Sequence, residues 1–388
     1  MSKKWISFIG LAVIMTMLAV LAAGCGGSTE SKDIKVGGNF EMTGGVATFG
    51  QSSANGAKLA FKEINAAGGV LGKQITFIVA DNKSEPSEST NAVTKLITQD
   101  KVVAVLGAVA SSNTLAASPV AMQNKVPFIT TSSTNPKVTV GDDGKVKDYA
   151  FRVCFIDPFQ GTVMANFATK SLKAKTAAIY IDNSSDYSKG LAEFFEKAFV
   201  AAGGKIVSKE AFLQKDQDFK ATLTKIKATN PEVIFIPGYY QEVGLIAKQA
   251  RELGINVPLL GGDGWDSPKL VEIAGGAALN NGFFSNHYSP EDKDPKVQKF
   301  VEDYKKEYGQ VPDALAALGY DAAYMLVDAI KRANSADPSK IKDAIAQTKG
   351  LAVVTGMVTL NEMHDPVKSA VVIEMKDGKQ VFKEKVNP

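Results

Sequence analysis

The sequence predicts an α/β fold with two similar lobes, and three observations lead to this prediction. Short apolar runs alternate with segments of helical periodicity along most of the chain. The alternation stops at a polar stretch, residues 137–147, and then begins again, so the chain carries two consecutive series of similar length. Strands that alternate with helices form parallel sheets with right-handed crossovers. A length of 388 residues is sufficient for two such lobes.

The first series repeats a strand and a helix. The helix expected after the first strand has Ala57, Phe61 and Ile64 on one stripe, and glycines at 68 and 69 end it. The third strand is a continuous apolar run, which is typical of a strand covered on both faces. Strands are expected at residues 34–38, 75–79, 102–106 and 126–130, and helices at 52–65, 86–99 and from residue 111 onward.

The second series follows the same pattern of alternating strands and helices. Near the C-terminus the expected segments are extended and have no helices between them. Asp377-Gly378 is a hairpin turn signal between two alternating runs, although periodicity does not say which lobe this hairpin joins. Helices are expected at residues 159–172, 189–202, 219–228, 243–253, 295–308, 314–333 and 339–348, and extended segments at 149–155, 177–181, 206–212, 233–236, 257–260, 283–288, 357–360, 370–375 and 380–385.

The composition excludes several classes of function. The formal charge of +3 is near balance and has no basic cluster, so nothing favours nucleic-acid binding. Only two histidines, His287 and His364, are present, which argues against a histidine metal centre and against histidine-based catalysis. Cys25 and Cys154 lie far apart in the sequence, and we expect no structural disulfide. We therefore expect neither a metal nor a cofactor.

The N-terminus is predicted to be a targeting segment. Lys3 and Lys4 precede an uncharged run, and small residues lead to Cys25. This arrangement resembles a bacterial lipoprotein signal, in which Cys25 becomes the lipidated first residue. Residues 1–25 would be the signal peptide and residues 26–33 a tether. An ordinary cleaved signal peptide and an uncleaved anchor helix remain alternatives.

Loops rich in hydroxyl groups and in aromatic and acidic residues follow the strands of the two series. In the first series, Ser111 opens a helix and Thr134 lies in a loop after the next strand. The carboxyl ends of parallel strands are where open α/β sheets bind ligands, and a helix start suits a carboxylate or a phosphate. In the second series the corresponding loops carry Tyr187, Tyr239 and Asp263, which suit an ammonium group. Together the loops favour a zwitterion.

Each of these residues also has an ordinary structural explanation. Ser111 could be a plain helix cap, and Asp263, which lies between glycines, could be a turn residue. Tyr239 could be packing, and Trp265 could cover the core of a lobe instead of lining a cleft. The functional interpretation depends on the convergence of several loops.

Several longer stretches carry a family resemblance that spans the chain after Lys32. The chain resembles the branched-chain amino-acid-binding proteins that deliver substrates to ABC importers, the leucine/isoleucine/valine group of type I periplasmic binding proteins. The motifs that carry the resemblance are residues 34–75, GAVASSNT, FITTSSTNP, PGYYQEVGLIAKQARELG and LLGGDGWDSPKL. The resemblance implies two Rossmann-like lobes joined by a three-segment hinge, with the ligand in the cleft between them. It places residues 34–153 and 285–355 in the first lobe and residues 154–284 and 356–388 in the second.

The resemblance also implies roles for individual residues. Ser111 would hold the ligand carboxylate, Thr134 would bind the ammonium and carboxylate region, and Asp263 would be the acidic partner of the ammonium. Other positions would supply a backbone contact, aromatic rings or the wall beside the ligand side chain. These are Ser132, Phe49, Tyr187, Tyr239, Val109, Ala110 and Leu315, with Trp265 nearby.

The predicted function is capture of a small amino acid, branched-chain or otherwise apolar, by a monomeric lipoprotein outside the cytoplasmic membrane. Lobe closure over the ligand would present it to a membrane permease with ATPase subunits. One rival is an amino-acid-sensing ectodomain. Another is a cleft enzyme with Asp263 and Asp266 as paired carboxylates, but the sequence has no nucleophile beside a histidine and GAVASSNT lacks the lysine of a P-loop. We therefore expect a binding protein and not an enzyme.

Overall fold

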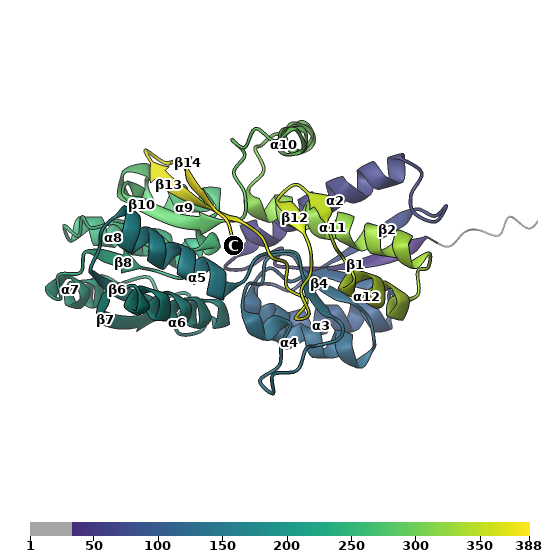
Figure 1. Cartoon of the computed structure of the whole chain (residues 1–388), viewed down its shortest axis with the longest axis horizontal. Helices are drawn as coiled ribbons and strands as arrows, with labels where there is room; N and C mark the ends of the chain where they lie inside the picture. Colours follow the sequence, from purple (N-terminus) through teal and green to yellow (C-terminus); the bar gives the residue numbers. More distant parts are fainter. Residues whose placement is uncertain (1–32) are drawn as a thin grey trace, which may run out of the picture. The chain divides into compact units, whose positions relative to one another are not determined.

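Two large β-sheets flanked by helices, together with a small two-stranded sheet, form the framework of residues 34–388 of the computed structural model (Figure 1). The structure describes residues 33–388. The predicted signal peptide, the predicted lipidation site Cys25 and nearly all of the predicted tether lie outside these residues. Among the described residues, no helix combines the length and the apolar character needed to cross a membrane.

The first sheet contains five parallel strands in the order β2-β1-β3-β4-β5. Helix α2 packs on α11, and α3 packs on α4. We call this sheet with its helices the first lobe. Its strands are β1 (Ile34–Phe40), β2 (Ile75–Asp81), β3 (Ala104–Gly107), β4 (Phe128–Thr130) and β5 (Ala150–Arg152). Its helices are α2 (Ala47–Ala66), α3 (Pro86–Thr98), α4 (Ser111–Gln123), α10 (Pro295–Tyr308), α11 (Ala314–Ala333) and α12 (Pro338–Ala346).

The second sheet contains seven strands in the order β14-β13-β10-β9-β8-β6-β7, and we call it with its helices the second lobe. The strands from β6 to β10 are parallel, whereas the C-terminal hairpin β13–β14 adds antiparallel strands beside β10. Its strands are β6 (Thr176–Asp182), β7 (Lys205–Phe212), β8 (Val233–Phe235), β9 (Leu259–Gly261), β10 (Gly282–Asn286), β13 (Ala370–Lys376) and β14 (Lys379–Val386). Its helices are α5 (Asp157–Asn166), α6 (Asp186–Ala201), α7 (Lys220–Ala228), α8 (Tyr240–Glu252) and α9 (Pro268–Ala274).

The α/β fold with two parallel-dominated sheets is confirmed, and the differences from the prediction are local. Helix α2 begins at Ala47, earlier than expected, and Gly50 allows this start because a Cβ there would lie 2.2 Å from the carbonyl oxygen of Glu41. The helix expected at residues 159–172 is α5 followed directly by a π-helical segment, Phe167–Ser171. The strand expected at residues 357–360 is β12 (Gly356–Val358), which pairs with β11 (Leu351–Val353) in a separate two-stranded sheet.

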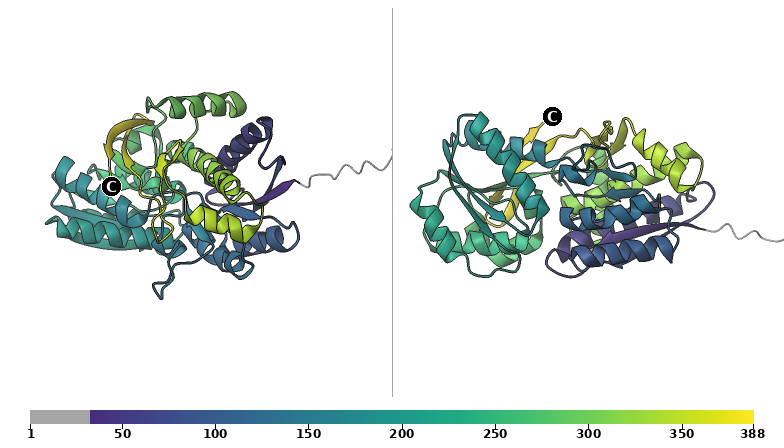
Figure 2. Two further views of the ribbon diagram at one scale, coloured as in Figure 1. Left: turned by 45° about the vertical axis from the view of Figure 1, so that its right-hand side comes forward. Right: turned by 90° about the horizontal axis from the view of Figure 1, so that it is seen from below.

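The chain passes between the two lobes three times: after β5, after β10, and between β12 and β13 (Figure 2). Two of these crossings are joined by the buried side chain of Lys368, whose ammonium group donates to the Val153 carbonyl oxygen at 3.1 Å and to the Thr355 hydroxyl. The Asp321 carboxylate on α11 accepts from the backbone N–H of Thr355 at 3.0 Å. Buried charges thus hold the crossing segments in place. The predicted residue limits of the two lobes stay a proposal.

Candidate functional site

A small cavity lies where the loops of the two lobes meet. Its volume is about 20 Å³. Every lining residue except Gly264 belongs to the set predicted from the sequence. The lining residues are Phe49, Val109, Ser111, Ser132, Tyr187, Tyr239, Asp263, Gly264 and Leu315.

The start of α4 forms one wall of the cavity, with Ser111 as its first residue. The sequence did not reveal that Glu41, directly after β1, occupies part of this helix start. Its buried carboxylate accepts from the backbone N–H groups of Val109 and Ala110, both at 3.1 Å, and from the Asn113 amide at 2.9 Å. Burial raises the pKa of Glu41, although these hydrogen bonds act in the opposite direction. An incoming carboxylate therefore cannot use the Val109 and Ala110 N–H groups while Glu41 holds them.

Arg152 positions the loop that carries Ser132 and Thr134. Its guanidinium donates to the carbonyl oxygens of Ser133 at 2.6 Å and Asn135 at 2.9 Å. It also forms a buried salt bridge of 2.6 Å with Asp365, a residue far along the chain. These contacts satisfy carbonyl groups that have no sheet partner, so they hold an irregular buried loop in one conformation.

Two predicted residues of the first lobe lie beside the cavity and do not line it. The Thr134 carbonyl oxygen accepts from the backbone N–H of Asp157 at 2.9 Å, and its hydroxyl accepts from the Gln160 amide at 3.4 Å. Ala110 lines a larger neighbouring cavity. Thr134 is therefore bonded to α5 of the second lobe.

Two tyrosines of the second lobe form an aromatic wall. The rings of Tyr187 and Tyr239 stack with a centroid separation of 5.1 Å and an interplanar angle of 7°. Phe49 of the first lobe meets Tyr239 edge to face at 5.8 Å. The Tyr187 hydroxyl accepts from the backbone N–H of Gly264 at 3.2 Å, and burial raises the pKa of both tyrosines, which stay neutral. Such ring faces suit aliphatic groups and cations.

Asp263 is the acidic group of the cavity and is 6% exposed. Its Oδ2 atom lies 2.8 Å from Nε2 of His287. Its Oδ1 atom is buried and has no hydrogen-bond partner among the described residues. A buried carboxylate oxygen without a donor is costly, and a ligand ammonium group would remove this cost. His287 itself was not predicted as a site residue, because a single histidine carries no periodic signal.

The structure does not place Trp265 at the cavity. Its side chain is fully buried, and the indole Nε1–H donates to the Ile236 carbonyl oxygen at 3.0 Å. A Cβ on Gly261 would lie 2.1 Å from the indole ring, so the indole packs directly on the backbone of β9. The ring therefore belongs to the core of the second lobe, as the packing alternative expected.

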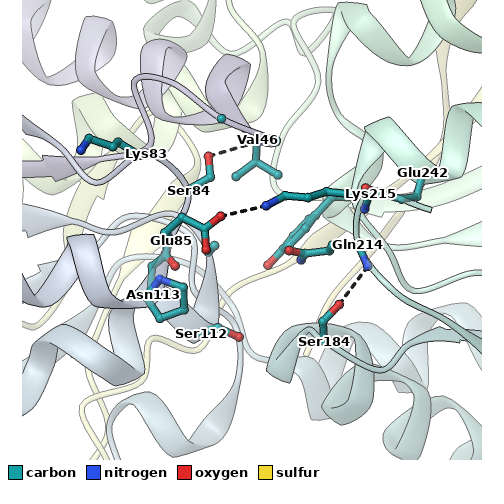
Figure 3. Close-up of a pocket in the computed structure, with 15 residues that line it drawn as sticks. Val46, Lys83, Ser84, Glu85, Ser112, Asn113, Ser184, Gln214, Lys215 and Glu242 are labelled. Atoms are coloured by element: carbon teal, nitrogen blue, oxygen red, sulfur yellow. Dashed lines mark hydrogen bonds and ion pairs between the residues drawn. The ribbon is translucent and has the colours of Figure 1, made fainter. Parts of the chain in front are cut away.

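A larger cavity of about 250 Å³ lies beside the small one, and residues of both lobes line it (Figure 3). The Lys215 ammonium lies 3.0 Å from the Glu85 carboxylate and joins the lobes across this cavity. Nearby, the Ser112 hydroxyl donates to the Asp186 carboxylate at 2.9 Å. The two lobes are therefore in direct contact at this cavity. Because both side chains of the ion pair are exposed, its contribution is about 0–1 kcal/mol.

The fold agrees with the comparisons with known proteins. The sequence profile described as periplasmic binding protein matches residues 33–380, so the chain belongs to this family. Within it, the chain is one of the branched-chain amino-acid ABC transporter substrate-binding proteins. The resemblance stated from the sequence is confirmed. These proteins are the solute-binding components of transport systems, so the prediction that the chain is not an enzyme is confirmed as well.

Individual relatives include solved structures of similar size. A leucine-binding protein from Thermotoga maritima is 42% identical, with a TM-score of 0.87 over 92% of this chain and 99% of that one. A branched-chain amino acid substrate-binding protein from Streptococcus pneumoniae, solved with isoleucine, is 39% identical, with a TM-score of 0.87 over 92% and 100%. A leucine-, isoleucine-, valine-, threonine- and alanine-binding protein from Pseudomonas aeruginosa is 30% identical over 339 residues, 87% of this chain and 88% of that protein.

Proposed function

We propose that this chain captures an L-amino acid with an aliphatic side chain, such as leucine or isoleucine, for an ABC importer. The observation that carries the proposal is the composition of the cavity walls. A buried carboxylate oxygen without a partner, on Asp263, lies across the same cavity as the Ser111 hydroxyl. The relatives described as binding leucine or isoleucine support this ligand class.

Each part of the amino acid has a chemical counterpart in the cavity. The ammonium group would bind Oδ1 of Asp263 beside the Tyr239 ring, and the carboxylate would bind the Ser111 hydroxyl near the start of α4. An aliphatic side chain would lie against Phe49, Val109 and Leu315. Ser132 and Tyr187 complete the proposed contact set, and Thr134 would act from beside the cavity. Apolar walls discriminate weakly between similar aliphatic groups, so we expect more than one such amino acid to bind.

Binding is proposed to act through closure of the lobes. The ligand would first meet Ser111 on the first lobe, and Tyr187, Tyr239 and Asp263 would reach it only when the second lobe closes. These additional contacts exist only in the closed form, and they shift the equilibrium toward it. We place the hinge near Val153, Phe284 and Thr355, and a permease with its ATPase subunits would recognise the closed form.

The protein is proposed to act as a monomer outside the cytoplasmic membrane, held there by lipid on Cys25. The Lys3 and Lys4 pair, the uncharged run after it and the small residues before the cysteine support this proposal. Cys25→Ser should release the protein from the membrane fraction. Retention of this variant in membranes would contradict lipid anchoring and favour an uncleaved anchor helix.

A thermal-shift screen of the purified protein against the twenty standard L-amino acids tests the ligand class. A ligand that binds only the folded protein raises its melting temperature, by more at higher ligand excess. Leucine, isoleucine or valine should give the largest shifts, whereas aspartate and lysine should give none. The D-enantiomer of the best ligand is the matched control, because it cannot present its ammonium, carboxylate and side chain to the same three walls. Failure of every aliphatic amino acid would contradict the proposed function.

A further inference from the structure

His287 contacts Asp263 and lies at one of the three crossings between the lobes. It directly follows β10, where the chain leaves the second sheet for the first lobe. Its side chain is fully buried, and the imidazole stacks on Phe155 with a centroid separation of 3.7 Å and an interplanar angle of 24°. Phe155 lies in the segment after β5, which is another crossing between the lobes. Packing thus fixes the orientation of the imidazole between two crossing segments.

The hydrogen bonds of His287 identify its tautomer. Nε2 lies 2.8 Å from Oδ2 of Asp263, and an ionised carboxylate only accepts hydrogen bonds, so Nε2 carries the proton. Nδ1 is buried and has no partner among the described residues. A second proton would create a buried N–H group without an acceptor, so the neutral form is favoured. Burial lowers the pKa of His287 in the same direction, although Asp263 opposes it.

Because of this contact, the two oxygen atoms of the Asp263 carboxylate differ in their hydrogen bonding. Oδ2 is held by His287, and Oδ1 remains for the cavity. Asp263 lies in a short 3₁₀ turn between two glycines, and its own backbone N–H donates to Oε1 of Gln160 at 3.4 Å. Among the described residues, the imidazole is the one group that hydrogen-bonds to this carboxylate, so it restrains the rotation of the carboxylate.

A second contact ties the same turn to the same crossing. The Asp266 carboxylate accepts from the Asn286 amide at 2.9 Å, one residue before His287. The same oxygen accepts from the backbone N–H of Ala314, at the start of α11 in the first lobe, at 2.8 Å. The turn that carries Asp263 is thus attached to the crossing after β10 at two successive residues, and to the first lobe.

We propose that His287 is a positioning residue: by holding Oδ2 of Asp263, it orients Oδ1 toward the ligand's α-ammonium group. The protein thereby selects ligands that carry this group. This inference rests on the proposed function. It assigns to His287 the preference for an α-amino acid over the same carboxylic acid without its amino group.

The test compares L-leucine with 4-methylpentanoate, which has the same skeleton without the amino group. Both are titrated by calorimetry or, where binding is weak, by ligand-observed NMR at millimolar concentrations. His287→Phe retains a ring that can stack on Phe155 and removes the donor. It should weaken L-leucine binding by about 10- to 100-fold, the range expected for a hydrogen bond to a charged group, and change 4-methylpentanoate binding by less than about 3-fold. His287→Gln, whose amide can reach Oδ2, should restore most of the preference.

A matched control is available in His364, which also stacks on a phenylalanine, Phe151, at 4.3 Å, and bonds the Ala150 carbonyl oxygen. His364→Phe should leave both affinities within about 2-fold. If His287→Phe does not fold, His287→Asn replaces it, because its shorter amide cannot reach Asp263. Equal losses for the two ligands, or no loss of L-leucine binding, would overturn the inference. Failure of the unaltered protein to bind any aliphatic amino acid would overturn the proposed function itself.

Discussion

Asp263→Asn is the substitution that separates ligand binding from folding most directly. The amide has the same shape as the carboxylate, and its oxygen can still accept from Nε2 of His287, which lies 2.8 Å from the native Oδ2. The amide NH₂ would then take the place of Oδ1, the oxygen that lies buried without a partner. An NH₂ group is a donor and would face the donors of the ligand ammonium. The variant therefore keeps the internal contact and loses the external one.

The expected loss of binding follows from these two changes. A hydrogen bond between charged groups contributes about 1.5–3 kcal/mol, and two donors that face each other add a further cost of about 1–3 kcal/mol. A sum of roughly 2.5–6 kcal/mol corresponds to an increase in Kd of about 70-fold or more. The free energy of unfolding should change by less than about 1 kcal/mol, because no buried group loses its partner.

Isothermal titration with L-leucine gives the affinity, and denaturant unfolding without ligand gives the stability. Asp266→Asn is the matched control from the same turn. Asp266 accepts from Asn286, Ala314 and Gln380 and does not line the small cavity, so its substitution should lower stability more than affinity. If Asp263→Asn binds L-leucine within about 3-fold of the unaltered protein, the assignment of Asp263 to the ammonium group is refuted.

Three further predictions concern the same cleft. Ser111→Ala should weaken L-leucine binding by about 1–3 kcal/mol through loss of one hydrogen bond to the carboxylate, and an unchanged calorimetric Kd would contradict that contact. Burial raises the pKa of Asp157 to about 7 from its ordinary 3.8, so between about pH 4 and pH 7 the folded protein binds more protons than the unfolded chain, and this group makes stability fall as pH rises. The stability of Asp157→Asn should therefore rise relative to that of the unaltered protein across that window, by at most about 1.4 kcal/mol per pH unit. A difference in unfolding free energy between the two proteins that stays constant with pH would disprove the shift. Lys215→Glu places like charges beside Glu85 and should speed ligand release by a few-fold at low salt, an effect that the double variant with Glu85→Lys reverses in stopped-flow measurements.

Much of the proposed site was predictable because its residues lie in recognisable loops. Ser111, Tyr239 and Asp263 each follow a short apolar strand, and parallel strands bring their carboxyl ends to one edge of a sheet. That rule needs only the order of strands and helices. It places a loop at the site without saying where each side chain points. Trp265 shows this limit, since it shares a turn with Asp263 but points into the core of the second lobe.

The groups that support the site were not predictable. Glu41, Arg152 and His287 each act through a partner that lies far away in the sequence, or on another element. None of them belongs to a periodic pattern, and a single charged residue after a strand is most often exposed to solvent. Only the folded chain reveals that these three side chains are buried and which groups they bind.

The sequence by itself determined the two α/β series, the family and the loops that carry most of the cavity, because periodicity, turn residues and motifs are properties of neighbouring residues. The tertiary structure alone decided that Glu41 occupies part of the α4 start and that His287 holds one oxygen of Asp263. It also decided that Thr134 bonds to α5. The physical reason is that a buried charge must find its partner within about 3 Å, and the fold sets that distance between segments that are remote along the chain.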